Sequence, residues 1–183
     1  MTTFKLGIGN AWLLSLPFFV LVGTFPMLMK KDLVKRMSDM TGYTSGEKFC
    51  TVAASISPYP FMLTTIWVPF TSSRPLLYLG LLVSVLGMVL AAASLKVIMS
   101  TPPDTLLTAG PYRYSRNPLY LSATVVFIGI CLATGNLVLT GYLAIMVLLQ
   151  HFMILAEERI CRLKYGEPFD RYVKRVPRYL IVV

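Results

Sequence analysis

The sequence predicts an all-α, multi-pass integral membrane protein built as one domain. Of its 183 residues, 56% are hydrophobic and only 14% are charged, whereas a soluble domain carries about 25% charged residues. The mean hydropathy is +0.68, and the charges stand between long uncharged runs. Because the backbone must satisfy its own hydrogen bonds in lipid, helices are the expected spans.

Uncharged runs predict about five transmembrane helices. The longest run, Asn117 to Ala156, is about twice the roughly 20 residues that cross a bilayer core. The turn signal Thr134-Gly135-Asn136 near its middle divides this run into two helices. The predicted spans are residues 6–29, 49–73, 75–95 (extending as far as 99), 119–133 and 137–156.

Prolines and glycines predict where these helices bend or stop. The step Pro58-Tyr59-Pro60 falls inside the second span, where proline removes a backbone donor and kinks a helix. After Ala156 the last helix is expected to continue through EERICRLKY and to stop at Gly166. The segment PFDRYVKR then predicts a short amphipathic helix at the membrane interface, in a cytoplasmic tail.

The distribution of lysine and arginine predicts the orientation. With the N-terminus outside, 15 basic residues fall on the cytoplasmic side and only two, Lys5 and Arg74, fall outside, as the positive-inside rule expects. The GPYR loop and the C-terminal tail then share the cytoplasmic face. Nucleic acid is not an expected partner despite the net charge of +9, because the charges flank apolar spans and form no continuous basic face.

The stretch GPYRYSRNPLY, Gly110 to Tyr120, is a basic, aromatic, turn-rich loop between apolar segments. Its arginines suit planar anions, its tyrosines offer flat faces for stacking, and Pro118 suits the first turn of the next helix. Glu157 and Glu158 stand where the last span leaves the membrane, on the same predicted face. Together the two segments predict a site for a charged small molecule beside the lipid.

Plainer structural roles stay open for the same residues. The loop can be a positive-inside anchor with interfacial tyrosines, and the glutamates can be a solvated surface paired with Arg159 and Arg162. His151, the only histidine, is a functional candidate as an ionisable group within a span, or it reaches for water at the interface. No metal site is expected, because the histidine and cysteine spacing matches no ligand pattern.

The segments TLLTAGPYRYSRNPLYL, EE and YGEPFDRYVKRVPR together resemble the membrane methyltransferases related to isoprenylcysteine carboxyl methyltransferase. The resemblance covers about Thr105 to Arg178, so residues 1–99 are expected to supply three spans and residues 100–183 the catalytic half. Asn117 replaces the usual histidine of that family, and the NPxY form is similar to that of phosphatidylethanolamine N-methyltransferases. The stretch HFMILA lacks the arginine that isoprenylcysteine enzymes carry before the glutamates, suited to a substrate carboxylate.

The resemblance implies a methyltransferase that uses S-adenosylmethionine, bound in a cytoplasm-facing pocket, and a lipophilic acceptor such as a phospholipid amine or another lipid. Glu157 or Glu158 would hold the donor, and His151 or a glutamate would be the base for an amine acceptor. The tail is also similar to that of membrane sterol reductases, which use NADPH, and a non-catalytic membrane scaffold is a third interpretation. The implied pocket residues are Leu106, Leu107, Thr108, Gly110, Tyr112, Arg116, Asn117, Pro118, Tyr120, Glu157 and Glu158.

Overall fold

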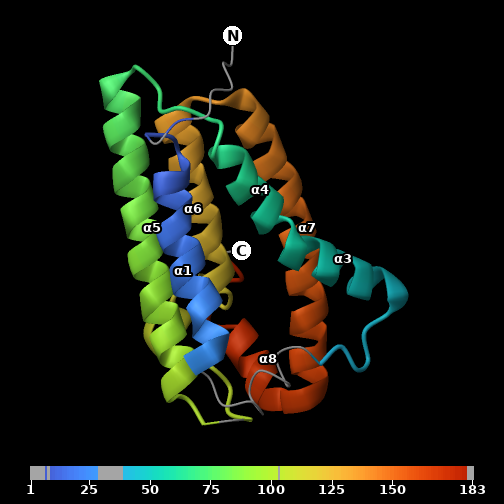
Figure 1. Ribbon diagram of the computed structural model, residues 1–183. Helices are drawn as coiled ribbons and strands as arrows, with labels where there is room; N and C mark the ends of the chain where they lie inside the picture. The colour runs from blue at the N-terminus through green and yellow to red at the C-terminus, as the bar shows by residue number, and fades with distance from the viewer. Residues whose placement is uncertain (1–6, 8, 29–38, 103, 181–183) are drawn as a thin grey trace.

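The computed structural model describes residues 7, 9–28, 39–102 and 104–180, and this part of the chain is helical without a strand. The all-α fold is therefore confirmed. The ends of the predicted first span and the basic residues 5, 30, 31, 35 and 36 lie outside the described residues. Figure 1 shows the helices, which are α1 (Trp12–Leu28), α3 (Ser45–Ile56), α4 (Pro58–Thr65), α5 (Arg74–Ser100), the 3-10 helix η1 (Gly110–Arg113), α6 (Pro118–Thr134), α7 (Leu137–Tyr165) and α8 (Glu167–Val173).

Two of the described helices, α5 and α7, are long and apolar enough to cross a membrane, with 27 and 29 residues. Only 22% of the most apolar window of α5, and 28% of that of α7, is buried inside the molecule. Large side chains such as Val89 and Ile145 are exposed instead, and extended apolar surfaces of this kind mark contact with a membrane or with another protein. The apolar helices of α1 and α6 are shorter, so the total of five crossings stays a prediction.

The run predicted as the second span is broken into two helices. α3 ends at Ile56 and α4 begins at Pro58, so the expected bend at the proline step is present as a break. After Thr65 the chain is non-helical until α5 begins, and residues 49–73 therefore do not form one continuous helix. The physical reason is that Pro58 and Pro60 lack the N–H groups with which an uninterrupted helix would bond to the preceding turn.

Small residues bring α5 and α6 into close contact. Gly80, Ser84, Gly87 and Ala91 are buried along one face of α5 at helical spacing. Such residues let helix backbones approach closely where lipid supplies no hydrophobic drive for association. A Cβ at Gly87 would lie 2.7 Å from Val126 Cγ2 of α6, so the contact leaves no room for a larger side chain.

Aromatic side chains join α1 and α4 to α6, and α7 to α4. The ring centroid of Phe127 in α6 lies 4.8 Å from that of Phe61 in α4 and 5.5 Å from that of Phe18 in α1. Tyr142 of α7 lies 6.0 Å from the Phe61 ring and donates a 3.0 Å hydrogen bond to the carbonyl of Ser57. This bond satisfies a backbone acceptor at the break between α3 and α4.

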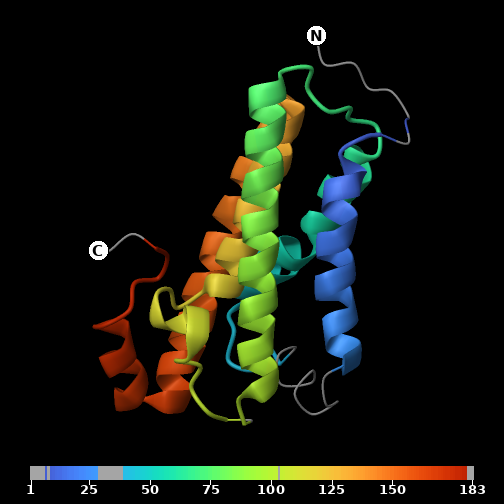
Figure 2. The same cartoon turned by 90° about the vertical axis from the view of Figure 1, so that its left-hand side faces the viewer.

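α5 and α7 end, and α6 begins, at one end of the bundle, which we call the loop end (Figure 1). α7 continues to Tyr165 and stops at Gly166, whose φ of +59° favours glycine. α8 then turns back, and Figure 2 shows the loop that precedes α6 lying between α5 and α8. The helix extension, its stop and the tail helix predicted from sequence are confirmed.

Candidate functional site

The GPYR stretch forms η1, a single turn that lies against the end of α5. Gly110 adopts a φ of +54°, a conformation that favours glycine, and a Cβ there would lie 2.8 Å from Val97 Cγ2. Tyr112 is buried, and its carbonyl accepts a 2.7 Å hydrogen bond from the hydroxyl of Tyr172 in α8. The loop is therefore fixed between the end of α5 and the tail.

Glu158 stands at the centre of a buried ion cluster, the Glu158 cluster, formed with Arg116, Asn117 and Arg178. Its Oε1 accepts from Arg116 Nε at 3.0 Å and from Asn117 Nδ2 at 3.2 Å, and its Oε2 accepts from Arg178 Nη2 at 2.9 Å. The side chains of Glu158 and Arg116 are only 10% and 8% exposed. The solvated pairing with Arg159 and Arg162 left open by the sequence is therefore wrong for Glu158, which joins α7, the loop and the tail.

The closing RVPR segment is also hydrogen-bonded directly to the loop. The backbone N–H of Arg116 donates to the carbonyl of Pro177 at 2.9 Å, and the hydroxyl of Ser115 donates to the carbonyl of Arg178 at 3.0 Å. The Arg116 guanidinium reaches the carbonyl of Val173 at 3.3 Å. Two motifs that are distant in the sequence thus form one unit.

A cavity of about 370 Å³ lies beside this unit, bounded by the loop, α7 and α8. We call it the donor-side cavity, after the methyl donor that the sequence resemblance implies. Its volume is within the range of small-molecule sites. Glu157 lines the cavity from α7, and the hydroxyl of Tyr120 in α6 donates to Glu157 Oε1 at 2.6 Å. Much of the remaining wall is apolar or aromatic, including Ile98, Leu106, Leu107, Leu119, Phe169 and Tyr172.

The connection before α3 supplies a third wall, which sequence reasoning missed. Asp39 and Tyr43 line the cavity from this connection. Arg159 holds it to α7 by donating to the carbonyl of Gly42 at 2.7 Å and to Glu47 Oε2 at 2.6 Å. The Arg159 hydrogen bonds, with a further bond from the backbone of Thr44, lower the pKa of Glu47 to about 2. No motif or periodicity marks these residues, because they meet the site only through the tertiary fold.

The structure brings eight of the eleven residues implied by the resemblance to the donor-side cavity. Thr108 lines a neighbouring cavity instead, Gly110 shapes the turn, and Pro118 is buried at the start of α6. His151 does not line the cavity, and its Nδ1 lies 2.9 Å from the hydroxyl of Tyr179. The eight residues at the cavity are Leu106, Leu107, Tyr112, Arg116, Asn117, Tyr120, Glu157 and Glu158.

The phenol groups of Tyr43, Tyr112 and Tyr172, which line the cavity, stay neutral near physiological pH. Burial raises the pKa of Tyr112, and the Tyr172 and Glu157 charges add to the rise. Burial also raises the pKa of Tyr172 and takes that of Tyr43 to about 12. These phenols can donate hydrogen bonds and stack, but they do not act as bases. Within the described residues no lysine or arginine forms an ion pair with Glu157, and burial raises the pKa of its carboxyl group to about 7. A cation bound beside Glu157 would therefore favour the ionised carboxylate.

Comparison with known proteins decides the family. Residues 75–168, just over half of the chain, match the family described as phospholipid methyltransferase. The chain belongs to the phospholipid methyltransferase family. This membership supports a membrane methyltransferase that acts on lipid, and it confirms the relationship that the loop and glutamate motifs indicated. No curated protein and no solved structure matches the chain.

The region shared with other phospholipid methyltransferases contains most of the site. Residues 75–168 include nearly all of α5 together with η1, α6 and α7, and they stop at the start of α8. Two parts of the site therefore lie outside the match. They are the connection with Tyr43, and the tail with Tyr172 and Arg178.

Proposed function

We propose that this phospholipid methyltransferase transfers a methyl group from S-adenosylmethionine to a lipophilic acceptor at the donor-side cavity. The observation that supports this most strongly is Glu157, a carboxylate bonded to Tyr120 in a cavity otherwise lined largely by apolar and aromatic groups. S-adenosylmethionine carries a cationic sulfur, an ammonium group and a planar base. A carboxylate and aromatic faces are the groups that complement these features.

Distinct roles follow for the two adjacent glutamates. Glu157 complements the positive charge of the donor, while Tyr112 or Tyr120 packs on its adenine. Glu158 already accepts hydrogen bonds from three side chains, so we assign it the role of positioning the loop, α7 and the tail around the donor. When bound, the donor supplies an electrophilic methyl group.

The residues around the cavity align the two reactants and exclude water from them. Alignment of bound reactants contributes roughly 7–11 kcal/mol to rate enhancement. The apolar part of the lining favours exclusion of water once both reactants are bound. The lipophilic acceptor enters from the bilayer, past the exposed apolar surface of α5 and α7. For an amine acceptor, we assign Glu157 as the base that takes the released proton, since His151 lies outside the cavity.

Ligand-dependent thermal stability in detergent tests the proposal. A ligand that prefers the folded state stabilises it by about 2.7 kcal/mol at a concentration of 100 times its Kd. S-adenosylmethionine and its demethylated product should both raise the Tm, and Glu157→Gln should reduce the shift. Glu167→Gln, at an exposed position outside the cavity, is the matched control.

Three results contradict the proposal or narrow it. A shift with NADPH alone would support a reductase, and no shift with either ligand would support a scaffold. Mass spectrometry of membrane extracts incubated with an isotopically labelled methyl donor then identifies the molecule that gains the label. Label found only on water-soluble molecules would contradict a lipophilic acceptor.

A further inference from the structure

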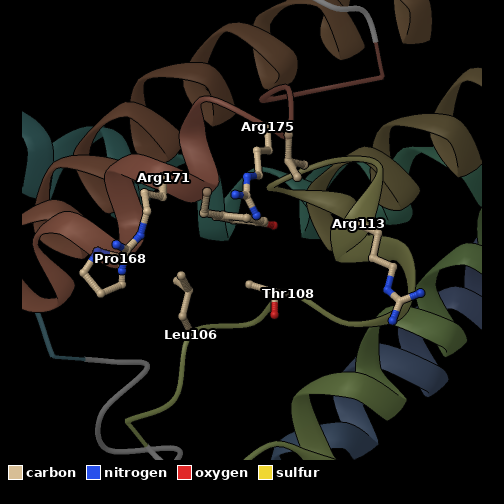
Figure 3. A pocket seen from close by; sticks show the side chains of 8 residues that line it. Leu106, Thr108, Arg113, Pro168, Arg171 and Arg175 are labelled. Atoms are coloured by element: carbon tan, nitrogen blue, oxygen red, sulfur yellow. The ribbon is translucent and has the colours of Figure 1, made fainter.

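A second cavity, of about 580 Å³, lies between the loop and α8. Three arginines line it from two sides, as Figure 3 shows. Arg171 and Arg175 come from α8 and the turn after it, and Arg113 comes from η1 across the cavity. The hydroxyl of Thr108 lies on the loop between them. We call this the arginine cavity, and it is separate from the Glu158 cluster, which uses Arg116 and Arg178.

The positive charge of the arginine cavity is largely uncompensated. Arg171 Nη1 lies 3.2 Å from Glu167 Oε1, but these side chains are 60% and 79% exposed, and exposed pairs of this kind hold each other weakly. Within the described residues neither Arg113 nor Arg175 forms an ion pair. Arg171 and Arg175 bring two guanidinium groups to one side of the cavity, and an anion beside them reduces their mutual repulsion. Arginine also matches phosphate with paired N–H donors.

The position of the cavity indicates which phosphate it meets. Both helices of spanning length, α5 and α7, end at the loop end, and the segments that follow them form the cavity. A site just beyond the ends of two spans lies at the depth of lipid headgroups, where basic pockets bind anionic lipids. Leu106, Pro168 and Val176 add apolar wall beside the arginines, which suits the glycerol part of a lipid better than a fully hydrated free anion.

The geometry points to the arginine cavity as a binding site for the phosphate group of a membrane phospholipid. Arg171 and Arg175 bind the phosphate, the Thr108 hydroxyl donates to one of its oxygens, and Arg113 adds positive charge from the opposite side of the cavity. The site is distinct from the donor-side cavity, although Leu106 and Tyr172 line both. It does not depend on methyl transfer, so a phospholipid would bind there with or without a methyl donor.

Binding of soluble short-chain ligands to the purified full chain tests this site. The ligands are dioctanoyl phosphatidic acid, uncharged dioctanoylglycerol and inorganic phosphate, each titrated in uncharged detergent. The test variant combines Arg113→Gln, Arg171→Gln and Arg175→Gln. The control combines Lys48→Gln, Lys96→Gln and Lys174→Gln, which removes the same charge from exposed side chains that line neither cavity. Far-ultraviolet circular dichroism checks that both variants keep their helices. This measurement needs no methyl donor.

The expected result is tight binding of phosphatidic acid by the natural chain and by the lysine control. The arginine variant should bind it roughly 100-fold more weakly, from about 1 kcal/mol for each basic residue near a lipid surface. Equal binding by the folded arginine variant would overturn the site, as would an equal loss in the lysine control. Inorganic phosphate that binds as tightly as the lipid would overturn the lipid assignment, and so would equal binding of dioctanoylglycerol.

Discussion

Substitution of Glu158 by glutamine separates the positioning role of this residue from donor binding. The carboxylate has an amide-like shape, so the change removes charge with little change in volume. Arg116 would keep its guanidinium buried, at 8% exposure, and Arg178 would keep its own at 31% exposure, without an anion between them. Removing one partner of a buried ion pair costs about 3–5 kcal/mol.

The magnitude for Glu158→Gln lies at the lower end of that range. Glutamine keeps one carbonyl oxygen, which can still accept from Arg116 or Asn117, and Arg178 is partly reached by water. We expect a loss of about 3 kcal/mol in the free energy of unfolding. At about 2–4 °C for each kcal/mol in a chain of this length, the Tm should fall by roughly 6–12 °C.

Glu157→Gln should behave in the opposite way. It leaves the Glu158 cluster intact and removes only a charge at the donor-side cavity, so the Tm without ligand should change little. The affinity for the demethylated donor, measured by calorimetry, should fall about 10–100-fold, as for a hydrogen bond to a charged group. Glu158→Gln should lower affinity only to the extent that it loosens the fold.

A double-mutant cycle completes the experiment. Arg116→Gln combined with Glu158→Gln should cost clearly less than the sum of the two single changes, because each single change leaves an unpaired buried partner. The assignment of roles would be refuted by a stable Glu158→Gln variant that has lost donor affinity. It would also be refuted by a Glu157→Gln variant that unfolds at a much lower temperature than the natural chain.

Three further predictions concern packing, pH and the histidine. Gly129→Ala should destabilise the α5–α6 contact by about 1–3 kcal/mol, because the added Cβ would lie against the backbone of α5. Gly141→Ala should show no such loss in thermal unfolding, because nothing lies within 4 Å of its added Cβ. The pKa of Glu47 is lowered from 4.5 to about 2 by hydrogen bonds from Arg159. The stability that the ionised Glu47 adds is therefore present above pH 4.5 and is lost as pH falls toward 2. Hydrogen exchange in α3 should accelerate across that window, and Glu47→Gln should abolish this pH dependence. His151→Gln should bind the demethylated donor as tightly as the natural chain in calorimetry, and a loss as large as that of Glu157→Gln would place the histidine at the site.

Sequence patterns located the helices where a single local signal was strong. The uncharged run ending at Ala156, the charged continuation of its helix and the stop at Gly166 all appear as expected, because periodicity and a glycine cap act within a few residues. The second run was harder to predict, since Pro58 signals a bend but does not tell a kink from a full break. At the break, the carbonyl of Ser57 accepts a hydrogen bond from distant Tyr142, a contact that no local pattern predicts.

The pair Glu157-Glu158 shows that a sequence motif can predict where residues lie without predicting which role each residue has. Glu157 and Glu158 are adjacent, and an α-helix turns about 100° for each residue. One side chain therefore faces the cavity and Tyr120, while the other faces Arg116 and Arg178. Nothing in the pair EE distinguishes them, because their partners come from separate parts of the chain.

The walls of the donor-side cavity are held with unequal strength. On one side, the Glu158 cluster is buried and ties three segments with several hydrogen bonds. On the other, the connection with Tyr43 is attached to α7 through Arg159 and Glu47, whose side chains are 41% and 23% exposed. Ion pairs that water partly reaches hold their partners weakly, so we expect local opening of the cavity to begin at the connection with Tyr43. We expect a water-soluble ligand to exchange through that side, because opening there leaves the contact between α5 and α6 unchanged.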